Sequence, residues 1–455
     1  TVGAMRRLLL TPAVILAAGP SAAGATTFTV NATGDATDAA PGNNVCATAG
    51  GQCTLRAAIV ESNAHAGVDA VTVPAGTYNV ATTLPVTSNL TVSGAGAGAT
   101  IVDGASGQQV FGLSGGAGAV TITGLTVTGA WTGVTTSVGE QTHDRVAIYG
   151  NVQTIAGTAY GAGMYISGAA KVFIARSAIV NNAATSTLSD AMGGGIYMTA
   201  GQLEIDTSTI AGNSAAAPSV GESSFGGGIS AIGGTVTLRH VTMSGNSATA
   251  GSAAHYGGNI YLQSTTASAA DSIFSDGVAS PGYQNCGGPS SLATTGRNID
   301  SGTSCGFGAG QLPSTNPQLV ALGDHGGPTV SAPPQLGSPA IGQAGACPVG
   351  GTDQRGAAAP AGAGCDIGAG ELSADLGVSL ALSRTEVPAG GDVTVIATVT
   401  NGGFDPAVAA ALDLTPAGAQ VVLATPSAGT CTPKRMAYHA AIASRSASSP
   451  VACVY

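Results

Sequence analysis

The sequence predicts an all-β protein whose centre is a right-handed parallel β-helix, with a short capping helix before it and a small, incomplete β-sandwich after it. Glycine accounts for 71 of the 455 residues without a strict collagen period, and only 8% of residues are charged, which favours many short strands joined by tight turns. Four glycine-led segments recur at spacings of 31 to 33 residues. Such a period is typical of a solenoid, in which each repeat packs on its neighbours.

The first 25 residues have the pattern of a secretory signal peptide. Arg6 and Arg7 precede an apolar run over 8–18, and an Ala-x-Ala arrangement ends at Ala25. The run is shorter than the roughly 20 residues that span a bilayer. We therefore expect a secreted or outer-surface protein with no transmembrane span in its mature chain.

Residues 26–80 are expected to form an N-terminal cap. The segment 53–67 has apolar residues at helical spacing, and a helix there would cover the open apolar end of the first coil. The run Cys53-Thr-Leu-Arg-Ala-Ala-Ile resembles the CSLREA domain of secreted bacterial β-helix proteins. Thr54 and Ala57 replace the Ser and Glu of that name.

The coils of the predicted β-helix occupy residues 81–305. Alignment of the repeats places apolar residues two positions apart, on one face of each strand, where they can fill a core. An asparagine recurs at one turn, where side-chain amides can hydrogen-bond from coil to coil. The stretch 133–154 breaks the period and predicts a protruding loop. The three columns are Met164, Ile196, Ile229 and Ile260, then Val172, Leu203 and Val236, and at the turn Asn182, Asn213 and Asn246.

Two further resemblances concern the coils and the segment after them. The repeats resemble polymorphic outer membrane repeats and pectate-lyase-like β-helices in general. The runs NPQLVALGDHGGPTVSAPPQLGSPAIGQAG at 316–345 and GCDIGAGE at 364–371 resemble the choice-of-anchor Q region, which closes many bacterial β-helix proteins. This resemblance assigns 306–372 to a closing region, although Gly342 and Gly370 depart from its pattern.

The C-terminal part of the chain changes character again. Alternating apolar segments separated by proline and glycine over 373–432 predict part of a β-sandwich, and they resemble a bacterial surface Ig-like repeat. Residues 433–455 lose this alternation and predict an irregular tail.

The eight cysteines fit an oxidising compartment. Six of them form three pairs that are close in sequence, which predicts small disulfide loops in an exported protein. The paired C-x-x-C spacings of zinc sites do not occur, so no metal site is predicted. The predicted disulfides are Cys46–Cys53, Cys286–Cys305 and Cys347–Cys365, and Cys431 and Cys453 are a fourth candidate pair.

The charge balance argues against nucleic acid as a partner. The formal net charge is −10, and lysine occurs only at Lys171 and Lys434. Binding to a phosphate backbone needs clustered cations, which this sequence lacks.

One small group of charged residues could carry chemistry. In the alignment Asp206 lies one coil from Arg239, and His240 lies one coil from Asp271, with Glu204 on the same face. Adjacent coils are about 4.8 Å apart, so these side chains can touch. They form either cross-strand charge pairs or a cleft for a charged sugar. Only the cleft would imply a polysaccharide lyase or glycoside hydrolase, and only the lyase would call for calcium; no other cofactor is predicted.

A second candidate site is aromatic. Tyr165, Tyr197 and Tyr261 occupy the outward position of the first strand of their coils. Stacked rings on a long sheet can receive sugar rings, or they can simply stabilise neighbouring coils.

These observations favour an exported surface or secreted protein that binds glycans or other surfaces without catalysis. The expected partner is a polysaccharide or the surface of a host or neighbouring cell. The alternative is a polysaccharide-degrading enzyme of the pectate-lyase-like type, and a passive structural role in the envelope is a third interpretation.

Overall fold

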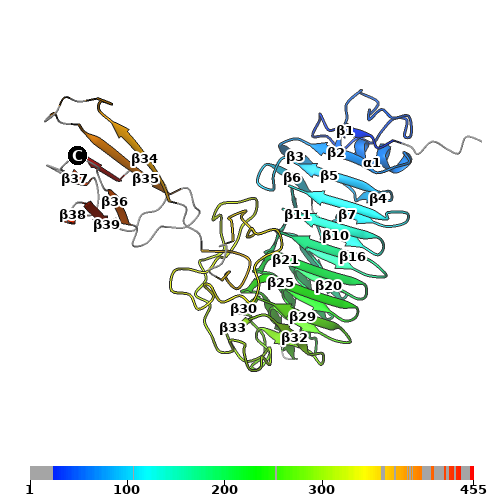
Figure 1. Ribbon diagram of the computed structural model, residues 1–455. Helices are drawn as coiled ribbons and strands as arrows, with labels where there is room; N and C mark the ends of the chain where they lie inside the picture. Colours follow the sequence, from blue (N-terminus) through cyan, green and yellow to red (C-terminus); the bar gives the residue numbers. More distant parts are fainter. Residues whose placement is uncertain are drawn as a thin grey trace, which may run out of the picture.

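The computed structural model describes residues 24–372 apart from 106, 252–253 and 360–363, and parts of 376–454. Its main body is the right-handed parallel β-helix that the repeats predict (Figure 1). The predicted signal peptide lies almost entirely outside the described residues.

The N-terminal end of the solenoid is covered by helix α1 (Leu55–Ala64), as the helical spacing predicts. The Thr54 hydroxyl accepts a hydrogen bond from the Ala57 amide and caps the helix. Arg56 forms an ion pair with Asp35 and donates to the Thr83 carbonyl, which ties the helix to the loop before it and to the coil behind it. The helix packs on β2 (Asp69–Val73) and β4 (Leu84–Val86) and seals the first coil.

Two sheets form the long walls of the solenoid. We call the seventeen-stranded sheet sheet A and the eight-stranded sheet sheet B. Sheet A contains β1 (Thr27–Thr29), β2 (Asp69–Val73), β3 (Gly76–Asn79), β5 (Leu90–Gly94), β6 (Thr100–Asp103), β8 (Ala119–Thr123), β9 (Thr126–Thr128), β11 (Glu140–Asp144), β12 (Ala147–Tyr149), β16 (Lys171–Ala175), β17 (Ala178–Val180), β21 (Gln202–Ala211), β25 (Thr235–Ser244), β29 (Thr266–Ala270), β30 (Ile273–Ser275), β32 (Leu292–Thr295) and β33 (Ile299–Asp300). Sheet B contains β4 (Leu84–Val86), β7 (Gln109–Leu113), β10 (Thr132–Thr136), β15 (Met164–Ile166), β20 (Ile196–Met198), β24 (Ile229–Ala231), β28 (Ile260–Leu262) and β31 (Cys286–Gly287).

Two narrow sheets complete the coils between sheets A and B. One of them precedes the glycine corner, where Gly193 has a φ of 60° and an added Cβ would lie 2.1 Å from the Ile196 carbonyl oxygen. The narrow sheets contain β13 (Val152–Ile155), β18 (Ala183–Ser186), β22 (Ser214–Ala217) and β26 (Ser247–Ala250), and β14 (Ala159–Tyr160), β19 (Ala191–Met192), β23 (Ser224–Phe225) and β27 (His255–Tyr256).

The predicted core columns are confirmed. Met164 pairs in register with Ile196 and then Ile229, and all three side chains are fully buried. In sheet A, Leu203 pairs in the same way with Val172 and Val236. Successive coils therefore stack identical positions, and the core is continuous from the cap to the last coil.

The predicted asparagine ladder is present and longer than expected. The Asn182 side chain donates to Asn213, and Asn213 donates to Asn246, each at 2.9 Å. The ladder begins one coil earlier at Asn151 and continues beyond Asn246 through Asn259. Because these side chains are fully buried, each bond satisfies a group that would otherwise be costly to bury.

The prediction of a protruding loop over 133–154 is wrong. This stretch forms a regular coil made of β10, β11, β12 and β13. The period is hidden in the sequence because Gln141 and His143 point inward, at the positions that Val172 and Ile174 occupy in the next coil.

The closing region, residues 306–372, lies against the outer face of sheet A. Leu322 and Val330 pack against Val180 and its neighbours, and the Thr209 hydroxyl of β21 donates to the Gln354 side chain at 2.6 Å. Further along, the Ala369 amide donates to the Thr242 hydroxyl of β25 at 2.9 Å.

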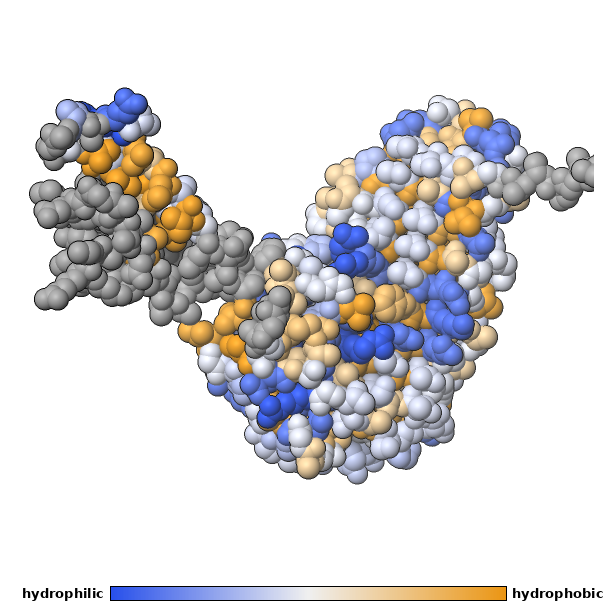
Figure 2. Space-filling view, in the orientation of Figure 1, coloured by the Kyte–Doolittle hydropathy of each residue, from blue (hydrophilic) through white to orange (hydrophobic). Residues whose placement is uncertain are grey.

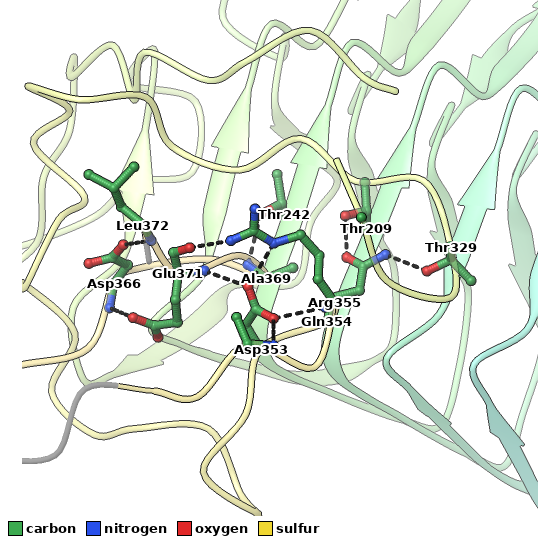
Figure 3. A network of polar contacts seen from close by, with 12 residues as sticks. Thr209, Thr242, Thr329, Asp353, Gln354, Arg355, Asp366, Ala369, Glu371 and Leu372 are labelled. Carbon is green, nitrogen blue, oxygen red and sulfur yellow. Dashed lines mark hydrogen bonds and ion pairs between the residues drawn. The ribbon is translucent and has the colours of Figure 1, made fainter. Parts of the chain in front are cut away.

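A buried polar network holds the closing region together (Figure 3). Arg355 forms an ion pair with Asp353 at 2.9 Å and donates to the Glu371 carbonyl. Burial raises the pKa of Glu371 to about 8. The network therefore fixes loops that contain almost no regular secondary structure.

The three predicted disulfides are present, with Cα–Cα distances of 5.1, 4.7 and 5.2 Å. Cys46–Cys53 lies beside the capping helix, Cys286–Cys305 in the last coils, and Cys347–Cys365 in the closing region. The side chains of the fourth candidate pair, Cys431 and Cys453, fall outside the described ones.

The C-terminal part forms antiparallel strands. The predicted irregular tail over 433–455 contains the end of one strand and two whole ones, and the last strand pairs with β35 (Val395–Asn401), so backbone pairing continues where side-chain alternation is lost. The strands are β34 (Leu376–Leu382), β35 (Val395–Asn401), β36 (Ala411–Leu414), β37 (Thr425–Pro426), β38 (Thr430–Lys434), β39 (Ala437–Ala441) and β40 (Val451–Val454).

Candidate functional site

Three residues of the charged group on sheet A form ion pairs. Asp206 and Arg239 face each other in register, as the alignment predicts, and the Arg239 Nε lies 3.3 Å from an Asp206 oxygen. The Arg239 Nη2 lies 2.8 Å from Glu204. Glu204 and Asp206 thus each have a cationic partner, as expected if this group forms cross-strand charge pairs.

The other two members of the group are buried beneath the closing region. The Asp271 carboxylate accepts hydrogen bonds from the backbone amides of Arg297 at 2.7 Å and of Gly345 at 2.6 Å, and only 2% of the residue is exposed. Burial lowers the pKa of His240, and the negative charges of Asp271 and Asp206 oppose that shift. The five residues lie on adjacent coils, and of the five only Glu204 and Arg239 have side chains that are more than a third exposed.

Among the residues that the structure describes, no three histidine, cysteine, aspartate or glutamate side chains lie together as a metal site. Strongly hydrophilic residues form separate groups on the face of the solenoid that Figure 2 shows, not one extended hydrophilic surface.

The aromatic residues of sheet B and of the neighbouring corner segments form two clusters. In the first, Tyr165 and Tyr197 stack with their ring centroids 5.6 Å apart, and Tyr160 lies 5.1 Å from Tyr165. In the second, Phe225 lies 4.8 Å from Tyr261. The remaining members of the second cluster are Tyr256 and Tyr283.

The two clusters are separate because smaller or flexible residues interrupt both aromatic columns. Ser230 lies between Tyr197 and Tyr261 in the outward column of sheet B. Met192 lies between Tyr160 and Phe225 in the neighbouring corner column.

The three tyrosines that the sequence singles out differ in accessibility. Tyr197 and Tyr261 are each only 8% exposed, and Tyr165 is half-buried. Burial, with a smaller contribution from Tyr165 and Tyr160, raises the pKa of Tyr197 to about 12. The more accessible rings are Tyr160, 36% exposed, and Tyr283, 42% exposed. A ligand would meet these outer rings, and the inner tyrosines support them.

A groove that sequence reasoning missed lies on the same face, toward the N-terminal end. It has a volume of about 400 Å³ and is formed by β4, β7, β10 and β15. Gly112 forms part of it and has no side chain, while Pro85 and Tyr165 belong to the strands on either side. In the sequence, the only sign of this groove is that Gly112 and Thr135 are small residues. They occupy successive outward positions, and the next residue in that column is Tyr165.

The outward column of sheet B is uncharged along its whole length. Register places one residue of each strand in this column, and they are Pro85, Gly112, Thr135, Tyr165, Tyr197, Ser230, Tyr261 and Gly287. Polar hydroxyls and aromatic rings are therefore the chemistry that this face offers to a ligand.

Two findings complete the description of the chain. No helix among the described residues is long and apolar enough to cross a membrane. Comparisons of this chain with protein families, with curated proteins and with solved structures give no match.

Proposed function

We propose that this protein is exported and binds polysaccharide through the outer face of sheet B, as a secreted or surface-attached binding protein. The observation that carries the proposal is the continuous uncharged column of sheet B, flanked by accessible aromatic rings. Adhesion to a glycan-coated surface is the role that such a face would serve.

The aromatic clusters match the chemistry of sugar recognition. An aromatic ring offers a large apolar surface, and a tyrosine adds a hydroxyl at its edge. Tyr160 and Tyr256 are accessible members of different clusters, three coils apart in the corner column. At about 4.8 Å per coil, these rings are spread along roughly 14 Å of the face, so a polymer could contact both.

Export is supported by several features of the chain. Residues 1–25 have the composition of a signal peptide, and the three disulfides are of a kind that persists in oxidising compartments. The resemblance of 53–59 to the CSLREA domain and of 306–372 to the choice-of-anchor Q region points to secreted β-helix proteins. The antiparallel strands from β34 onward would suit an Ig-like spacer that carries the binding face away from its attachment.

The enzymatic alternative is less well supported. A glycosidase needs two carboxylates on either side of the scissile bond. Asp206 is paired with Arg239, and Asp271 holds backbone amides of the closing region. A polysaccharide lyase or hydrolase at this place would require the closing region to leave sheet A.

Binding of the full chain to a panel of soluble polysaccharides, measured by affinity electrophoresis, tests the proposal. The double variant Tyr160→Ala, Tyr256→Ala should weaken binding by about tenfold or more, because two stacking surfaces are lost. The matched control is Tyr149→Ala, which removes an exposed tyrosine from sheet A. Equal loss in the control variant, or release of new reducing ends from the polymers, would contradict the proposal.

A further inference from the structure

The groove between β4 and β15 has properties that the aromatic clusters do not share. It lies on the open face of sheet B, and eleven residues line it, none of them charged. Gly112 places no side chain between its outward neighbours in register, which are Pro85 on one side and Thr135 on the other. Gly112 does not require a positive φ, so the absence of a side chain is what distinguishes this position.

The polar groups of the groove are arranged to meet a ligand that both donates and accepts hydrogen bonds. The Thr135 hydroxyl donates to the Gln109 Oε1 at 2.8 Å, which leaves the Gln109 amide nitrogen as a donor and the Thr135 oxygen as an acceptor. Ser114 and Ser137, which each carry a hydroxyl group, also belong to the lining. Sugar hydroxyls match such groups, because each can donate and accept.

The same lining disfavours an acidic sugar. Carboxylates are best recognised by arginine or lysine, whose charge-assisted hydrogen bonds are about twice as strong as neutral ones. The groove offers no cation, and the whole chain carries a net charge of −10, which repels a polyanion.

The groove also sets a direction for the bound chain. Tyr165 lines the groove and is a member of the first aromatic cluster, so the two sites adjoin. The column from Pro85 to Tyr165 crosses three coil steps, about 14 Å along the solenoid axis. A ligand that fills the groove and continues onto the Tyr160 ring would therefore run across the strands.

We propose that this groove is a subsite for an uncharged glycan segment, which enters it and extends along the solenoid axis onto the Tyr165 and Tyr160 rings. This inference rests on the proposed function, since it specifies which polysaccharides the face of sheet B accepts and where they bind.

The test compares neutral with acidic polymers on the full chain. Soluble xylan, galactomannan and β-glucan serve as neutral probes, and polygalacturonate and alginate as acidic ones, all in affinity electrophoresis at one ionic strength. The wild-type chain should bind at least one neutral probe and bind it more tightly than either acidic probe. A preference for an acidic probe would overturn the inference while leaving glycan binding in place.

Two variants locate the binding in the groove. Thr135→Tyr continues the tyrosine column into the groove and should weaken binding of the neutral probe by about tenfold or more. Its matched control is Thr142→Tyr, which adds the same ring to the same coil on the outer face of sheet A. Gln109→Ala removes an exposed side chain together with its hydrogen bond from Thr135, and should weaken binding by about fivefold.

The outcomes separate the two proposals. If Thr135→Tyr and Gln109→Ala bind like the wild-type chain while Tyr160→Ala, Tyr256→Ala does not, the rings bind glycan and the groove does not, and the inference is overturned. If the wild-type chain binds none of the probes, both proposals fail.

Discussion

The two walls of the solenoid differ in what lies outside them. Sheet A carries the paired charges of Glu204, Asp206 and Arg239, and the closing region covers part of it. Sheet B carries hydroxyls and aromatic rings, and its groove is open. The same repeats thus form one wall that binds the closing region of the chain and another wall that is open to a ligand. Outward charge on a β-helix does not by itself mark the functional face, because a later segment can use that charge as an anchor.

The difference between the two sheets should be reduced most by removing Asp271, the carboxylate that anchors the closing region to sheet A. Asp271→Ala deprives the amides of Arg297, Gly345 and Ala346 of their acceptor in a buried place. We expect the free energy of unfolding to fall by about 4 kcal/mol in urea denaturation, because three charge-assisted hydrogen bonds to a buried carboxylate are lost. Limited proteolysis should cut the closing region first. Unchanged stability and protease resistance would show that the coverage of sheet A does not depend on this carboxylate.

Sheet A also carries a buried histidine, His143, on its inner side. Burial lowers the pKa of His143 to about 4, whereas an unfolded histidine titrates near 6.5. Between these values the unfolded chain binds the proton and the folded chain does not, so stability falls as pH falls from 6.5 to 4. We expect His143 to contribute a loss of about 3 kcal/mol over this window.

Urea denaturation at pH 7 and at pH 4 measures this loss. The variant His143→Leu, which continues the apolar column of Ile122 and Ile174, should show a smaller loss by about the same amount. A loss of equal size in the variant and in the wild-type chain would contradict the assignment to His143.

A buried tyrosine of sheet B and an exposed tyrosine of sheet A should differ in what they contribute to stability. Tyr197 is nearly buried and stacks on Tyr165, so Tyr197→Ala should lower the free energy of unfolding by about 2 kcal/mol. Tyr149→Ala, at an exposed ring of sheet A, should change it by about 0.5 kcal/mol or less. Thermal or chemical denaturation of the two variants side by side checks this. Equal changes in the free energy of unfolding would mean that the stacking of Tyr197 on Tyr165 does not stabilise the coils.

The smallest effect is expected at the exposed ion pair of sheet A. Glu204→Gln leaves Arg239 with its Asp206 partner, so stability should change by about 0.5 kcal/mol or less. Binding to neutral polysaccharide should not change, because the residue lies on the other wall. A clear loss of polysaccharide binding or turnover in this variant would move the functional site to sheet A.

The sequence was sufficient for the parts of the molecule that repeat. The columns of Met164 and Asn213 could be predicted because coils stack equal positions, so one alignment gives both the core and its register. The coil at 133–154 escaped prediction because Gln141 and His143 are inward residues of the wrong polarity.

The contacts that define the two walls were harder to predict. The hydrogen bond from Ala369 to Thr242 joins segments more than a hundred residues apart, and the closing region has no periodic pattern that predicts it. The groove depends on Gly112 lying beside Thr135, which only the register of non-repeating early coils reveals. Sequence patterns thus predicted the scaffold, whereas which of its faces stays open depended on a non-periodic segment.

The asparagine ladder has a consequence for how such a protein can change length. Each of Asn151, Asn182 and Asn213 bonds to the equivalent residue one coil further on, so the linkage is the same at these three steps. A whole coil could be duplicated or deleted in evolution without leaving an amide unpaired. Each duplication would lengthen the open wall by about 4.8 Å, so the reach of the protein along a polymer would vary in units of one coil.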